Sequence, residues 1–119
     1  MENKNKDCIF CKIASGEISA EKILDSDNFF AIKDINPKTK GHSLIISKKH
    51  YKTLIDMPDS LLGEFLEKTK KLALKLLKEE NAEGFNLIMN NYEIAGQIVP
   101  HVHIHILPRK KQDGFRGNV

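Results

Sequence analysis

The strongest constraint on this chain is a seven-residue stretch near its C-terminal end, His101-Val102-His103-Ile104-His105-Ile106-Leu107. Histidines recur there at every second position, and apolar residues fill the gaps. Because alternate side chains of a β-strand point to opposite faces, this period of two predicts a strand with all its histidines on one face. Val102, Ile104 and Ile106 would then face a hydrophobic core.

A row of imidazoles on one strand face has two interpretations. A histidine-rich strand can simply lie exposed at the surface, and for a single histidine that is the simpler interpretation. A neutral imidazole, with an ordinary pKa near 6.5, can also act as a nucleophile, a hydrogen-bond donor or a metal ligand. Because these histidines share one face and are backed by a continuous apolar face, we predict a functional site.

Length and composition indicate one soluble domain. The chain has 119 residues, of which 40% are hydrophobic and 29% charged, values that are ordinary for a globular protein. No apolar run approaches the ~20 residues that a membrane span needs. The polar N-terminus lacks the apolar segment of a signal peptide, so we expect a cytoplasmic protein with a disordered tail over residues 1–7.

The charged residues and the cysteines narrow the kind of partner. The net charge is only +3, and of the 19 basic side chains only Arg109 and Arg116 are arginines. Arginine is the side chain that most often contacts base edges, so we do not expect nucleic-acid binding.

Cys8 and Cys11 form the single Cys-x-x-Cys pair, which indicates a metal or redox site and not a disulfide framework.

Periodicity and turn residues predict a mixed architecture. A short helix after Cys11 should end near Gly16, and apolar residues at helical spacing predict one long helix over 61–77. Strands are expected over 21–25, 29–34, 42–47, 85–90 and 101–107. Five strands with few helices between them predict an α+β fold with a mainly antiparallel sheet.

The histidine stretch resembles the histidine-triad (HIT) motif, His-φ-His-φ-His-φ-φ with φ apolar. Gly96-Gln97 before it and Leu107-Pro108-Arg109 after it also resemble bacterial members of that family. The resemblance covers nearly the whole chain, from Cys8 to Arg109. It implies a HIT-like fold with a HIT domain over residues 8–110, a C-terminal tail over 111–119, and the homodimer found in the Hint and Fhit branches.

The resemblance implies a catalytic role for each histidine of the motif. His103 corresponds to the nucleophile, which attacks an α-phosphorus and forms a nucleotidyl-histidine that water then hydrolyses. The backbone carbonyl of His101 would accept a hydrogen bond from the His103 ring and thereby select its tautomer. His105 would donate to a phosphate oxygen, and His42 matches a further family histidine near the triad.

The resemblance also implies a nucleotide-binding set around the triad. Asp34 would accept hydrogen bonds from both ribose hydroxyls, and Gln97 and Asn90 would be neutral donors to the phosphate. An apolar slot for the base would be formed by Phe10, Ile13, Ile32 and Ile35. Without the resemblance, Asp34 and Asn90 would be interpreted as turn residues, His42 as a surface histidine and the apolar set as core.

A structural zinc site is the third implication. Bacterial HIT proteins use a Cys-Cys-His-His pattern, which here corresponds to Cys8, Cys11, His50 and His101. Zinc at His101 would stiffen the strand whose carbonyl orients the nucleophile. The alternative is a free or redox-active cysteine pair, but a thioredoxin-like motif should sit inside a βαβ unit, and this pair precedes the first predicted strand.

One position departs from the family pattern. Many relatives have Ser or Thr where this chain has Ile98, and their hydroxyl lies near the phosphate and the leaving group. Isoleucine keeps the backbone N–H but has no side-chain donor. This departure puts protonation of the leaving group in question.

We therefore expect a hydrolase of purine nucleoside phosphoramidates or related adenylated compounds. A dinucleoside polyphosphate hydrolase of the Fhit kind is the second enzyme interpretation. The alternative from another class is a zinc- and nucleotide-binding interaction module with little turnover, which Ile98 keeps open.

Overall fold

The computed structural model describes residues 7–117 and residue 119, so the predicted N-terminal tail lies outside the described residues except for Asp7. The helices and strands are, in order, α1 (Ile9–Ala14), β1 (Leu24–Asp25), β2 (Phe29–Lys33), β3 (Ser43–Ser47), α2 (Leu62–Glu79), β4 (Gly84–Ile88) and β5 (His103–Arg109). Short 3₁₀ turns lie at Leu54–Asp56, Asp59–Leu61 and Glu93–Ala95. None of the described helices is long and apolar enough to span a membrane.

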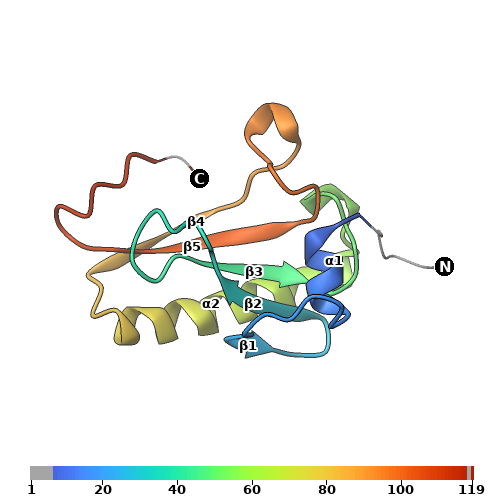
Figure 1. Ribbon diagram of the computed structural model, residues 1–119, viewed down its shortest axis with the longest axis horizontal. Helices are drawn as coiled ribbons and strands as arrows, with labels where there is room; N and C mark the ends of the chain where they lie inside the picture. Colours follow the sequence, from blue (N-terminus) through green and yellow to red (C-terminus); the bar gives the residue numbers. More distant parts are fainter. Residues whose placement is uncertain (1–6, 118) are drawn as a thin grey trace.

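The strands form one five-stranded sheet in the order β1-β2-β3-β5-β4, and every neighbouring pair is antiparallel. This confirms the predicted α+β fold with one long and one short helix. The sheet pairs β5, which carries two of the triad histidines, with β3 on one side and β4 on the other (Figure 1). His103 lies opposite Ile46, and His105 lies opposite Leu44 and Ile88.

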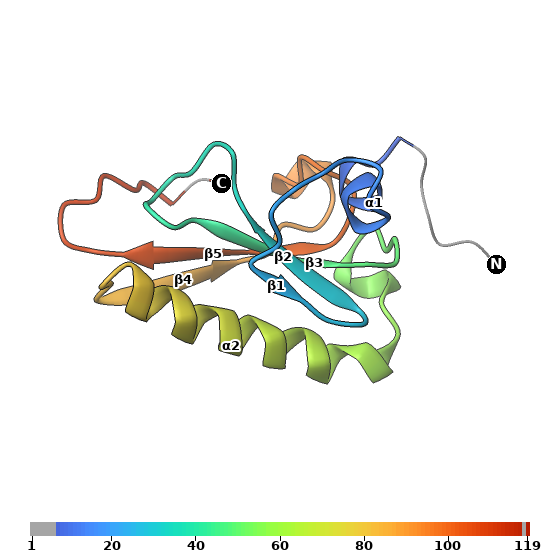
Figure 2. The same ribbon diagram turned by 60° about the horizontal axis from the view of Figure 1, so that its bottom comes forward.

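Two layers cover the sheet, one on each face (Figure 2). Helix α2 covers the first face, where Val102, Ile104 and Ile106 pack into a core with residues of α2. Helix α1 and the loops that follow β2 and β4 lie on the opposite face, toward which the histidines point. The core on that face consists of Cys8, Phe10, Cys11, Ile13, Phe30, Ile32, Leu44 and Ile46. The predicted division of β5 into an apolar and a histidine face is confirmed, and the exposed-strand interpretation is wrong because all three triad histidines are buried.

Two predicted strands differ clearly in their bounds from the strands of the structure: one is shifted along the chain and the other is shorter. The triad strand begins at His103 and not at His101, because Pro100 has no N–H and the N–H of Val102 bonds to the Tyr51 carbonyl outside the β3–β5 ladder. The first strand is reduced to Leu24–Asp25. It lies at the edge of the sheet, with β2 as its only strand neighbour among the described residues.

The segment after β5 turns back toward the middle of the molecule (Figure 1). Asp113 fixes this turn: its carboxylate accepts hydrogen bonds from the Arg109 guanidinium at 2.6 and 3.0 Å and from the backbone N–H of Lys110 and Phe115. The Arg109 guanidinium also lies over the Phe115 ring, 4.7 Å from its centre. The predicted C-terminal tail thus has local structure of its own.

Candidate functional site

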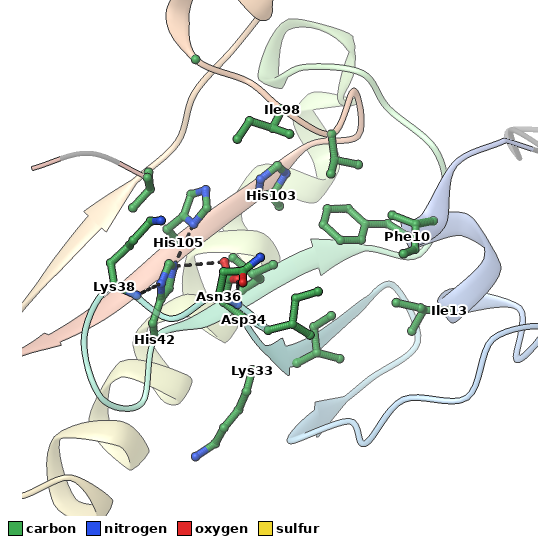
Figure 3. Close-up of a pocket in the computed structure, with 17 residues that line it drawn as sticks. Phe10, Ile13, Lys33, Asp34, Asn36, Lys38, His42, Ile98, His103 and His105 are labelled. Carbon is green, nitrogen blue, oxygen red and sulfur yellow. Dashed lines mark hydrogen bonds and ion pairs between the residues drawn. The ribbon is translucent and has the colours of Figure 1, made fainter.

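The histidine face of β5 forms the floor of a pocket of about 320 Å³ between α1, the loop after β2 and the segment before β5 (Figure 3). Phe10 and Ile13 lie at one end of it and His105 at the other, with Asp34 and His103 between them. The four residues predicted for the apolar slot all line the pocket: Phe10, Ile13, Ile32 and Ile35. Of these, Ile35 is 89% exposed, so it covers the pocket from the solvent side.

His103 is held by the backbone beside it. Its Nδ1 lies 2.7 Å from the His101 carbonyl oxygen, and because a carbonyl can only accept, Nδ1 must carry the proton. The ring edge packs against Phe10, with the ring centres 5.1 Å apart. In the neutral ring the lone pair is therefore on Nε2, and a side chain that lines the pocket in this tautomer can act as a nucleophile.

A chain of hydrogen bonds fixes the tautomers of the other two pocket histidines. The backbone N–H of Lys38 donates to His42 Nδ1 at 3.1 Å, so in the neutral ring His42 must carry its proton on Nε2. That N–H lies 2.9 Å from His105 Nδ1, which must accept it. His105 then carries its own proton on Nε2. This chain of hydrogen bonds, from Lys38 through His42 to His105, therefore makes His105 a hydrogen-bond donor to the pocket and not a base.

Burial keeps these histidines neutral. It lowers the pKa of His42 and His103 below the ordinary value near 6.5. It lowers the pKa of His105 to about 4, with a further contribution from the neighbouring rings of His103 and His42. Neutral imidazoles are the form that the tautomer assignment requires.

Asp34 follows β2 and is the one Asp or Glu side chain that lines the pocket among the described residues. Its Oδ1 accepts the backbone N–H of Asn36 at 2.8 Å, which fixes the orientation of the carboxylate. Its Oδ2 lies 3.5 Å from His42 Nε2. The carboxylate is thus placed between the apolar end and the histidine end of the pocket, where it can accept hydroxyl donors.

A second cluster lies behind the triad. Cys8 Sγ is 3.2 Å from His101 Nδ1, and Cys11 Sγ is 3.3 Å from His50 Nδ1. The ligand atoms of these four residues all lie within 4.8 Å of one another, so the cluster could hold a metal ion. His101 Nε2 lies 2.7 Å from the Ser47 carbonyl and must donate to it, which leaves the Nδ1 lone pair toward the thiols. Burial raises the pKa of the Cys8 thiol.

Gln97 and Asn90, predicted as phosphate donors, do not line the pocket. The Gln97 side chain is buried and joins two loops, donating to the Lys52 carbonyl and accepting the N–H of Tyr92. Asn90 donates to the Gly96 carbonyl at 3.4 Å. Both side chains therefore shape the loop that carries Ile98, whose backbone N–H has no acceptor among the described residues.

Sequence reasoning missed two residues of the site. Lys38 lines the pocket, and its backbone N–H orients His42. Ser47 anchors His101 through its carbonyl and, at 3.2 Å, its hydroxyl. No motif signals either residue, although Lys38 lies between Pro37 and Gly41 in a loop that the sequence does identify.

Comparisons with known proteins decide the family. The HIT domain matches residues 15–112, which is most of the chain. The chain belongs to the HIT family. Its predicted motif, His101 to Leu107, lies inside the matched region.

Relatives within the HIT family include proteins with named activities. An uncharacterized HIT-like protein of Methanocaldococcus jannaschii is 46% identical over 107 residues, 90% of this chain and 82% of the relative. Adenylylsulfatase HINT3 of Arabidopsis thaliana is 43% identical over 90% of this chain, which spans only 54% of that protein. Adenosine 5′-monophosphoramidase HNT1 of Candida albicans is 41% identical over 88% of this chain and 72% of its own length. Two of these relatives are thus named for an enzymatic activity, and the remaining one is not.

Solved structures of similar proteins agree with the fold. The crystal structure of SMU.412c from Streptococcus mutans superposes with a TM-score of 0.93 at 37% identity, over 100% of this chain and 76% of that one. A HIT family member from Bacillus subtilis superposes with a TM-score of 0.89 at 37% identity, over 96% and 82% of the two chains.

Proposed function

We propose that this HIT protein hydrolyses adenylated compounds, purine nucleoside phosphoramidates among them, through a nucleotidyl intermediate on His103. The observation that carries the proposal is the 2.7 Å contact between His103 Nδ1 and the His101 carbonyl oxygen. This contact assigns the lone pair to Nε2 in a pocket whose other polar groups suit a nucleotide.

The steps follow from the donors and acceptors around His103. Its Nε2 forms a bond to the α-phosphorus while the bond from phosphorus to the leaving group breaks. Two donors stabilise negative charge on the phosphoryl oxygens: the His105 ring N–H and the Ile98 backbone N–H. His105 is a donor because its other ring nitrogen accepts a hydrogen bond from His42. Water then attacks the nucleotidyl-histidine, releases the nucleoside monophosphate and restores the neutral ring.

Zinc is part of the proposal as a structural ion held by Cys8, Cys11, His50 and His101. The donor chemistry fits, because two thiols and two imidazoles form a complete tetrahedral ligand set and His101 Nδ1 has no proton in the assigned tautomer. Bound zinc would cross-link α1 to the two segments that carry the histidines. His101 belongs to this cluster and also orients His103 through its carbonyl, so the two sites share a residue.

We also propose a homodimer built on the groove between α2 and β4. The exposed apolar side chains of this groove are Leu66, Leu74, Phe85 and Leu87. β4 is an edge strand whose outer side pairs with no other described strand, and a second copy could continue the sheet there. Light scattering should find a dimer in the wild type and in Ile55→Glu, and a monomer in Leu87→Glu. A Leu87→Glu variant that stays dimeric would place the interface elsewhere.

Substrate assays test the proposed activity against its alternatives. Adenosine 5′-phosphoramidate and a diadenosine polyphosphate are offered separately to the wild type and to His103→Ala. We expect turnover of the phosphoramidate by the wild type and loss of more than about a hundredfold in kcat for His103→Ala. Faster turnover of the diadenosine polyphosphate would favour the Fhit-like activity. If the protein binds both compounds and hydrolyses neither, the interaction module is favoured. Ile98 supports that alternative, because it has no hydroxyl where many relatives have Ser or Thr.

A further inference from the structure

The nucleotide pocket has an order along its length. Its apolar end is formed by Phe10 and Ile13, Asp34 and His103 follow, and His105 and Lys38 lie at the far end (Figure 3). A nucleotide with its base at Phe10, its ribose on Asp34 and its α-phosphorus before His103 directs whatever follows that phosphorus toward Lys38. A residue at this end would lie near the leaving group of a nucleotide bound in this way.

The backbone of Lys38 is held close to the reacting histidines. Its N–H donates to His42 Nδ1 at 3.1 Å, and the backbone N–H of His42 donates to the Thr39 carbonyl at 3.1 Å. This tight loop is possible because Gly41 adopts a positive φ of 89°. Figure 3 shows the Lys38 side chain running along the pocket beside His105. The side chain is exposed, and its ammonium group lies at this end of the pocket.

Lys38 forms no ion pair with any other described residue. The other pocket lysine, Lys33, pairs with Glu80 at 3.8 Å, outside the pocket. The Asp34 carboxylate accepts the backbone N–H of Asn36, and its Oδ2 lies 3.5 Å from His42 Nε2. Among residues 7–117 and 119, no Asp or Glu lies within ion-pair distance of Lys38. The far end of the pocket thus carries one positive charge next to neutral histidines.

We propose that Lys38 selects substrates whose leaving group is an anion, namely adenylyl anhydrides with an inorganic acid such as sulfate or phosphate. The inference rests on the proposed hydrolysis at His103. As the His103 Nε2–phosphorus bond forms, the bond from phosphorus to the bridging oxygen breaks and its electron pair leaves with the sulfate. The ammonium of Lys38 stabilises this developing negative charge.

A second observation agrees with an anionic leaving group. Sulfate departs without taking up a proton, whereas an amine must gain one as it leaves. Ile98, which lines the same pocket and is 82% exposed, offers no side-chain proton donor. A pocket that has the Lys38 ammonium and lacks a side-chain hydroxyl at position 98 suits a leaving group whose negative charge is stabilised and which takes up no proton.

The test compares two substrates that share the adenylyl part and differ in the leaving group. Adenosine 5′-phosphosulfate loses sulfate, and adenosine 5′-phosphoramidate loses an amine. Lys38→Met keeps the backbone N–H that orients His42 and removes only the charge. We expect it to lower the ratio of kcat/KM for the phosphosulfate to that for the phosphoramidate about tenfold. Lys38→Arg should restore the ratio, and Lys40→Met, an exposed neighbour outside the pocket lining, should leave it at the wild-type value.

Other outcomes overturn the inference. An unchanged ratio in Lys38→Met, even with both rates lowered, shows that Lys38 does not act on the leaving group. A ratio that falls equally in Lys40→Met shows that only the general surface charge matters. In the wild type, the ratio of kcat/KM for the phosphosulfate to that for the phosphoramidate should also decrease in high salt. The reason is that the screening length falls from about 10 Å at 0.1 M to about 3 Å at 1 M.

A binding measurement separates this inference from the proposed function. Calorimetry with α,β-methylene-ADP, whose extra phosphonate-linked phosphate stands where an anionic leaving group would be, is compared with calorimetry of AMP. Lys38→Met should weaken binding of the diphosphate analogue about tenfold more than that of AMP. A wild type that hydrolyses neither substrate contradicts the proposed function, and the binding comparison then tests Lys38 by itself. Equal losses of affinity for AMP and for the diphosphate analogue in Lys38→Met would show that Lys38 does not contact the group beyond the α-phosphorus.

Discussion

His42 Nε2 lies 2.9 Å from His105 Nδ1, and the proton between them belongs to His42. The Lys38 backbone N–H occupies the other ring nitrogen of His42, so the direction of this hydrogen bond is fixed in the neutral rings. The consequence is that His105 presents an N–H to the pocket. The backbone amide of Lys38, four residues before His42, thus determines that His105 offers the pocket a donor and not an acceptor.

The first prediction concerns pH and stability. Burial lowers the pKa of His105 in the folded protein to about 4, whereas an unfolded histidine titrates near 6.5. Between these values the unfolded chain takes up a proton that the folded chain does not, so the free energy of unfolding decreases as the pH falls. Urea titrations at several pH values between 7 and 4.5 should show a shallower decrease for His105→Gln, by up to about 1.4 kcal/mol per pH unit. Parallel pH dependences of the two proteins would show that His105 is not held neutral by the fold.

The second prediction concerns the metal. Elemental analysis should find about one zinc per wild-type chain. Cys8→Ser should lose it, and its Tm should fall by roughly 5–15 °C, because binding of a structural ion contributes directly to folding. Chelator treatment is the control: it should lower the Tm of the wild type and leave that of Cys8→Ser unchanged. A wild-type protein that holds no metal and melts at the same temperature with and without chelator would leave the cysteines as a redox or free thiol pair.

The sequence predicted the metal cluster more completely than it predicted the nucleotide pocket. Cys8, Cys11, His50 and His101 are each a residue type that binds zinc, and the resemblance to bacterial HIT proteins named them as a set before any geometry was known; the fold brings them together. Lys38 could not be found in the same way. Lysine is the commonest charged residue of the chain, and only the loop conformation places this one at the pocket.

The hydrogen-bond partners of individual side chains are likewise not readable from the sequence pattern. Gln97 was expected at the phosphate because an amide next to the triad suits that role, but its donor and acceptor both bond to loop backbone. The sequence pattern carries no information on which of two polar partners an amide takes. The start of β5 was misjudged for a similar reason, since the alternation of His101 and His103 continues past the point where the ladder ends.

The third prediction concerns the ribose. Asp34→Asn should weaken binding of AMP roughly tenfold, because a neutral amide accepts hydroxyl donors less well than a carboxylate. Binding of 2′,3′-dideoxy-AMP, which lacks both hydroxyls, should change by less than about twofold. Asp27→Asn in the turn before β2 serves as the control for loss of one charge. Equal losses for both nucleotides, measured by calorimetry, would show that Asp34 does not hold the ribose.

The fourth prediction concerns the residue that departs from the family pattern. Ile98→Ser should raise kcat, and the gain should be largest for the poorest leaving groups, because these depend most on a proton donor. A recovered hydrogen bond of ~1.5–3 kcal/mol corresponds to roughly ten- to a hundredfold. The measurement is a series of adenosine phosphoesters with graded leaving-group pKa. Ile94→Ser, at a side chain that is 98% exposed and outside the pocket lining, is the control. A gain in kcat that is the same for all leaving groups of the series would show that the side chain at position 98 does not protonate the leaving group.

The central claim is that His103 forms a covalent bond to the nucleotide, and a trapped intermediate tests it most directly. The wild type and His103→Ala are mixed with an adenosine 5′-phosphoramidate, quenched in alkali, which preserves a phosphorus–nitrogen bond, and analysed by mass spectrometry of intact protein and peptides. We predict a transient adenylyl group on the peptide that contains His103 in the wild type, and none in His103→Ala. An adenylyl group on another residue, or full turnover by His103→Ala without any adduct, would contradict the account.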